Sequence, residues 1–101
     1  MAQFDVYENT NAKSKERVPF FLNVQDDLHE GLATRAIVPL VKDLPPITHL
    51  NPVFTINGQK VLMATQEMAA VPRELCQIKV ASLADRRDEI ISAIDFLITG
   101  F

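Results

Sequence analysis

The sequence predicts an α+β protein in which antiparallel strands are followed by one C-terminal helix. Before Ser82, apolar and polar residues alternate along several short runs, as expected of half-buried strands. Asn57 and Gly58 separate two β-prone runs, and both residues tolerate the positive φ of a tight hairpin turn. After Ser82, polar residues recur every three or four positions, which is the period of a helix. Strands followed by a helix are typical of a small curled sheet or barrel.

The predicted strands occupy separate regions of the chain. Alternation of polar and apolar residues predicts the first two, and Pro19 suits the start of the second. Pro39 has no N–H to donate, so it is expected to confine its strand to an edge of the sheet or to break it near its end. In chain order the regions are Gln3–Tyr7, Phe20–Gln25, Thr34–Leu40, the hairpin Val53–Met63 and Leu75–Val80. A polar loop is expected at Glu8–Arg17 and an extended connector at Leu44–Ile47.

The helix is predicted within Ser82–Thr99 from one narrow polar stripe. The members of this stripe are Asp85, Asp88, Ser92, Asp95 and Thr99. Ser82 or Asp85 is expected to cap the start of the helix, where acidic residues also suit the helix dipole.

The second half of this helix is more apolar than packing against one sheet requires. The expected core stripe is Ile90, Ala93, Ile94 and Leu97. Ile91 and Ile98 fall outside that stripe, and a helix that is apolar nearly all round must be covered from a second direction. Asp95 and the carboxylate of Phe101 each cost about 0.3–1 kcal/mol near the negative end of the helix dipole. We therefore expect a second copy of the chain, or a cationic partner, to cover this end.

Composition limits the classes of function. The chain has 101 residues, a formal net charge of -3 and a pI of about 5.2, which fits one domain over residues 1–101 and argues against a dedicated nucleic-acid binder. No apolar run approaches the roughly 18 residues of a membrane span, and the start of the chain lacks the basic and apolar regions of a signal peptide. With a single cysteine, Cys76, no internal disulfide is possible, so we expect a cytoplasmic protein with no membrane association.

No active site with a recognisable signature is present in the sequence. His29 and His49 are not spaced as metal ligands to each other or to Cys76, so neither a metal nor another cofactor is expected. Cys76 is expected to be a buried structural thiol rather than a nucleophile. The group Asp26, Asp27, His29 and Glu30 could hold an acid and a base, but a solvated turn is the expected arrangement.

Five segments together resemble the CcdB family of plasmid and chromosomal toxins that poison DNA gyrase. They are QFDVY at the start, VQDDL (Val24–Leu28), IVPL (Ile37–Leu40), EMAAVP (Glu67–Pro72) and the C-terminal AIDFLITGF. The resemblance covers essentially the whole chain. It implies an SH3-like, five-stranded antiparallel barrel extended by a small sheet, a long C-terminal helix and a two-fold symmetric homodimer.

The same resemblance implies a non-catalytic toxin that binds the A subunit of gyrase and traps the gyrase–DNA cleavage complex. A CcdA-like antitoxin with a disordered segment would strip the toxin from gyrase. Together the two proteins would repress their operon, so operator DNA is met only through the antitoxin complex.

The resemblance also implies the contact residues. Gyrase would bind to the end of the helix and to two residues after the second strand. The helix residues are Asp95, Ile98, Thr99, Gly100 and Phe101, and the other two are Leu28 and His29. In the family's best-known pattern the chain ends in Trp-Gly-Ile, and Thr99 stands in place of that tryptophan. Gly100 is expected to take a positive φ just after the helix. An acidic antitoxin segment is expected at the polar loop, on Glu8, Lys13, Lys15 and Arg17.

Two other interpretations stay open. A MazF-like endoribonuclease toxin would need a basic groove and a positioned acid–base pair, whereas the basic residues of this chain are dispersed. A CcdB-like dimer that has lost gyrase binding is the other, because Thr99 cannot supply the stacking of a tryptophan on arginine.

Overall fold

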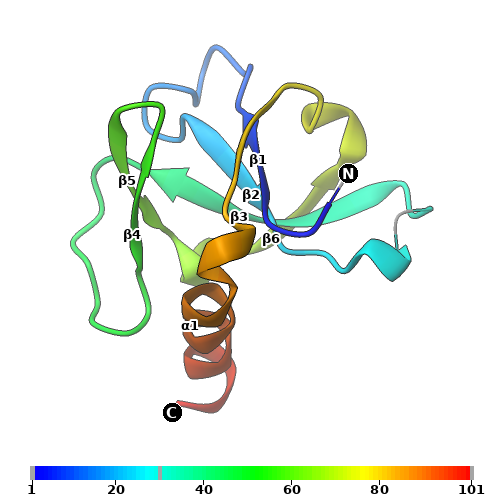
Figure 1. Ribbon diagram of the computed structural model, residues 1–101. Helices are drawn as coiled ribbons and strands as arrows, with labels where there is room; N and C mark the ends of the chain where they lie inside the picture. Colours follow the sequence, from blue (N-terminus) through cyan, green and yellow to red (C-terminus); the bar gives the residue numbers. More distant parts are fainter. Residues whose placement is uncertain (1, 30, 101) are drawn as a thin grey trace.

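The structure is a computed structural model that describes residues 2–29 and 31–100. Within these residues, seven strands form one curled antiparallel sheet, and helix α1 (Arg87–Thr99) follows them and runs away from the sheet (Figure 1). The strands are β1 (Asp5–Glu8), β2 (Phe20–Asn23), β3 (Thr34–Val41), β4 (Val53–Ile56), β5 (Gln59–Met63), β6 (Ala69–Pro72) and β7 (Lys79–Ser82). This arrangement confirms the predicted α+β class.

Strand β3 is the centre of the sheet, whose order is β4-β5-β3-β2-β1-β7. One side of β3 pairs with β2, and the other side pairs first with β6, as far as Ile37, and then with β5, from Leu40. Pro39 lies where the partner on this second side changes, and its carbonyl accepts a bond from the Ala64 N–H at 2.9 Å. The missing N–H of Pro39 therefore falls where the ladder changes partner. The strand is central and continues to Val41, so the prediction that Pro39 confines it to an edge or breaks it near its end is wrong.

The hairpin is confirmed, and the strand region after it needs correction. Asn57 and Gly58 have φ angles of 50° and 80°, as a type I′ turn requires. Arg73–Leu75 forms a 3-10 turn, and β7 begins only at Lys79, so a strand from Leu75 is wrong. Strand β6 was not predicted, because its Ala-Ala-Val-Pro run lacks alternation and becomes a strand only by pairing with β3.

Helix α1 also starts later than the polar stripe suggests. A 3-10 turn over Ala84–Arg86 precedes it, and the Ser82 Oγ accepts a hydrogen bond from the Ala84 N–H at 3.3 Å. No side-chain hydrogen bond caps α1 itself. Ser82 thus serves the turn, and the expected capping of the helix by Ser82 or Asp85 is wrong.

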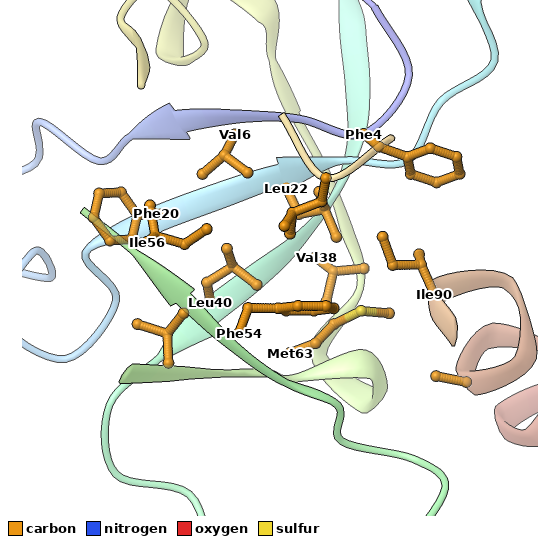
Figure 2. Packing of buried hydrophobic residues seen from close by; sticks show 13 residues of the cluster. Phe4, Val6, Phe20, Leu22, Val38, Leu40, Phe54, Ile56, Met63 and Ile90 are labelled. Carbon is orange, nitrogen blue, oxygen red and sulfur yellow. The ribbon is translucent and has the colours of Figure 1, made fainter. Parts of the chain in front are cut away.

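The main core lies between the curled sheet and the first half of α1, with Ile90 pointing toward the strands (Figure 2). Ile90 and Ala93 are fully buried, whereas Leu97 is 39% exposed. The expected place of Leu97 in the core is wrong, because the helix leaves the sheet before reaching it. Ile91, expected outside the core, packs partly against it. The sheet and its connections contribute Phe4, Val6, Phe20, Leu22, Val38, Leu40, Phe54, Ile56, Val61, Met63 and Leu83.

The opposite face of the sheet carries a smaller buried cluster, formed by Tyr7, Ile37 and Cys76. The Tyr7 hydroxyl donates to the Asp5 Oδ2 at 3.4 Å, and Asp5 also pairs with the Lys79 ammonium at 3.2 Å. Burial, and after it the neighbouring Asp5 carboxylate, raises the pKa of Tyr7 from 10.0 to about 12.

We expect the protein to lose stability in alkali as Tyr7 ionises. The pKa of Tyr7 is higher in the folded state than in the unfolded state. The contribution of the protonated Tyr7 to the free energy of unfolding is therefore complete below pH 10.0, and it is lost as the pH rises to about 12. The shift corresponds to about 2–3 kcal/mol. Urea unfolding of the wild type and of Tyr7→Phe across this pH range measures it. The free energy of unfolding should fall by this additional amount in the wild type, and equal falls in both proteins would contradict the assignment.

Candidate functional site

The end of α1 is an exposed surface that projects away from the sheet (Figure 1). Ile98 is 74% exposed, and its neighbours Asp95 and Thr99 are also exposed. The Thr99 hydroxyl donates to the Asp95 carbonyl at 2.7 Å, which holds this side chain against its own helix. The large apolar side chain of Ile98 is therefore exposed to solvent beside polar groups, which is common at surfaces that bind a second protein.

Gly100 ends the helix in the left-handed conformation, with φ 78° and ψ 15°. Its N–H donates to the Phe96 carbonyl at 2.9 Å, which satisfies one of the helix's last carbonyl groups. The expected positive φ of Gly100 is confirmed. Phe101, which the resemblance places among the contacts, lies outside the described residues.

Leu28 and His29 lie on a short 3-10 turn (Asp27–His29) at another corner of the molecule. The turn is held in place by carboxylates, since Asp26 accepts the Leu28 N–H at 2.8 Å and Asp27 accepts an N–H of the N-terminal segment at 2.7 Å. Leu28 is 89% exposed. The structure does not bring this turn to the end of α1 within one chain (Figure 1). Glu30, grouped with these residues in the sequence, lies outside the described residues.

The polar loop between β1 and β2 is folded around the buried side chain of Asn9. The Asn9 amide donates to the Val18 carbonyl at 2.7 Å and to the Ser14 hydroxyl at 3.0 Å. These bonds fold the loop back and leave the side chains of Lys13 and Lys15 exposed. The loop therefore exposes the ammonium groups of Lys13 and Lys15 from a backbone that the Asn9 hydrogen bonds hold in a defined conformation.

The antitoxin-site residues are only partly brought together. Glu8 and Lys15 line one pocket of about 180 Å³, to which Lys42 also contributes. Arg17 instead pairs with Glu67, with 3.1 Å between its guanidinium and the carboxylate. Lys42 was missed by sequence reasoning, because it reaches this place only through the sheet, where its N–H bonds to the Arg17 carbonyl at 3.1 Å.

Cys76 and the groups that could ligate a metal are the remaining titratable candidates from the sequence. Cys76 is buried, and burial raises the pKa of its thiol while Arg35 acts in the opposite direction, so the thiol is protonated at neutral pH. The expected buried thiol is confirmed. Among residues 2–29 and 31–100, no group of three or more His, Cys, Asp or Glu is placed to hold a metal. In the same part of the chain, no helix is long and apolar enough to cross a bilayer.

The sequence of the chain matches one known protein family. The family model described as CcdB protein matches residues 3–100, nearly the whole chain. The chain belongs to the CcdB family. Membership places it among the toxins of toxin–antitoxin modules, and the toxins of the CcdB family are poisons rather than catalytic enzymes. In a CcdB-family toxin, the exposed helix end, the Asp27–His29 turn and the polar loop are candidate surfaces for binding other proteins.

Proposed function

We propose that this CcdB-family toxin is a single-domain, cytoplasmic homodimer that binds the A subunit of DNA gyrase and traps the gyrase–DNA cleavage complex. The observation that carries the proposal is the 74% exposure of Ile98 on the projecting end of α1. An apolar anchor of this kind at the centre of an interface contributes much of its binding energy.

The proposed gyrase surface consists of Asp95, Ile98, Thr99, Gly100 and Phe101, with Leu28 and His29 as a second, smaller part. Leu28 supports the second part because, among residues 2–29 and 31–100, it is the most exposed of the large apolar side chains. The two parts are separate in one chain (Figure 1). We propose that two-fold pairing of two copies brings them to one composite surface.

The homodimer is supported by the apolar end of α1. Leu97 and Ile98 are both exposed in a single chain, and the core of that chain ends before them. A second copy would cover part of this surface and leave the rest for gyrase.

The test is a cleavage assay with purified toxin, gyrase and supercoiled DNA. After denaturation of the enzyme, gyrase that has been trapped in the cleavage complex should yield linear DNA in proportion to added toxin. The same assay without gyrase serves as the control. Unchanged supercoiling and no linear DNA at saturating toxin would contradict the proposal, and cleavage of bare RNA by the toxin alone would favour an endoribonuclease.

We propose that a CcdA-like antitoxin binds the polar loop through Glu8, Lys13, Lys15 and Arg17. Lys13 and Lys15 support this site because their ammonium groups are exposed and carry no ion pair within residues 2–29 and 31–100. An acidic disordered segment would find both cations on one folded loop. Repression of the operon and plasmid maintenance would follow through this complex, with operator DNA met only by way of the antitoxin.

Charge reversal at the loop should weaken antitoxin binding and leave gyrase poisoning unchanged. Lys13→Glu with Lys15→Glu replaces two attractive charges by two repulsive ones, and we expect a loss of about tenfold to a hundredfold in affinity, greatest at low salt. Calorimetric titration with the antitoxin's acidic segment measures it. Arg73→Glu, a single charge reversal at an exposed position outside the loop, is the control. Equal affinities of the double variant and this control would move the antitoxin site elsewhere.

A further inference from the structure

A pocket of about 470 Å³ lies between the connector before β4 and the outward face of α1. The connector contributes His49, Asn51 and Pro52, and the helix contributes Glu89, Ser92 and Phe96. The three helix residues recur at i, i+3 and i+7, so they lie along one face. Ile98 lies two residues beyond Phe96, about 200° around the helix, so this pocket is separate from the apolar anchor proposed for gyrase.

The connector wall of the pocket is held in place by buried hydrogen bonds. The buried Asn51 side chain accepts the Ile47 N–H at 2.9 Å and donates to the Met63 carbonyl at 2.9 Å and to the Gln66 side chain at 2.8 Å. His49 has a φ of 69°, a conformation that non-glycine residues adopt uncommonly. This backbone brings its ring to the edge of the Phe96 ring, with 6.2 Å between centroids. The pocket therefore has two aromatic walls that are set before any ligand arrives.

The helix wall of the pocket supplies a carboxylate with one open oxygen. Arg86 donates twice to Glu89, at 2.9 and 2.6 Å, and both bonds fall on Oε1. Within residues 2–29 and 31–100, no hydrogen bond reaches the Oε2 of Glu89. Asp88 and Asp95 are exposed on the neighbouring stripe of the same helix, and no cation of the described residues pairs with either. Two carboxylates, unpaired among the described residues, therefore stand near the pocket in addition to Glu89, whose own charge is partly balanced by Arg86.

We propose that this pocket binds an arginine side chain presented by a protein partner. A guanidinium group is planar and weakly hydrated, so it can stack on the open face of one of the two rings, Phe96 or His49, while one edge pairs with the Oε2 of Glu89. A lysine ammonium would satisfy the charge but has no flat surface to lie against a ring. A purely apolar side chain would cover the Oε2 of Glu89 without giving it a hydrogen bond, which is unfavourable.

The experiment is an NMR titration of the toxin with acetyl-Gly-Arg-Gly-amide. The matched peptide, acetyl-Gly-citrulline-Gly-amide, has the same shape without the charge. Shifts of the Ser92, Phe96 and His49 signals should saturate with the arginine peptide, and the citrulline peptide should bind about threefold to tenfold more weakly. Equal affinity for both peptides, or shifts confined to other surfaces, would overturn the proposal.

Three variants sharpen the test. Glu89→Gln keeps the shape of the side chain, and Phe96→Leu keeps apolar packing but removes the ring. Each should weaken the arginine peptide by about threefold to fivefold. Asp88→Asn removes a carboxylate from the same helix outside the pocket and should change the affinity less than twofold. Unchanged binding by both pocket variants, with their folds verified by their spectra, would also overturn the proposal. Because the peptide assay involves no gyrase, its result is independent of the proposed target.

Discussion

Ile98→Lys is expected to abolish growth inhibition by the toxin while the chain still folds. Ile98 is 74% exposed, so its replacement removes little from the core. A lysine near the C-terminal end of α1 also suits the helix dipole. In a complex with gyrase, however, the ammonium would be buried in place of an apolar anchor. Loss of such an anchor costs about 2–4 kcal/mol, or roughly thirtyfold to a thousandfold in affinity.

Two measurements on the same variant check this result. Thermal unfolding should differ by only a few degrees from the wild type, whereas cleavage-complex formation should require at least about thirtyfold more toxin. Gln77→Lys is the matched control, because it adds the same charge at an exposed position before β7. A well-folded Ile98→Lys toxin that poisons gyrase as strongly as the control would exclude the end of α1 as the target surface.

Phe54→Ala is expected to remove about 3–5 kcal/mol from the free energy of unfolding. Phe54 lies on β4, is 1% exposed and belongs to the main core. The Arg86 guanidinium also lies over the Phe54 ring, 4.8 Å from the ring centroid. Truncation therefore leaves a cavity in the core and removes a cation–π contact. Such a loss is a large part of the total stability of a small domain.

Urea unfolding followed by circular dichroism measures this effect. Phe54→Leu keeps most of the buried volume and should cost much less, about 1–1.5 kcal/mol. If the alanine variant is already unfolded without urea, the leucine variant and a stability titration with an osmolyte keep the comparison measurable. A loss below about 1 kcal/mol for the alanine variant would show that the ring does not fill the core as described.

The candidate site could be predicted in part, residue by residue. Gly100 was expected to end the helix with a positive φ, because few other residues adopt that conformation at low cost, and it does. The exposure of Ile98 follows from the excess of apolar residues around the helix. The prediction that Leu97 belongs to the core is wrong. Periodicity shows which face of a helix is apolar, but it does not show where along the helix the contact with the sheet ends.

Features that depend only on neighbouring residues can be predicted without the fold. The hairpin follows from the φ preferences of Asn57 and Gly58, and the helix follows from a short repeating period. The CcdB-family resemblance, carried by five short segments in order, also needed no tertiary information. These features survive because their physical causes act within a few positions of the chain.

The folded sheet determines which distant segments lie together. It made Pro39 part of the central strand, turned Ala69–Pro72 into a strand, and set His49 against Phe96 across a pocket. It also carried Lys42 to the polar loop. Each of these depends on pairing or packing between segments remote in sequence, whose free energy exists only once the sheet has closed and is therefore absent from any local pattern.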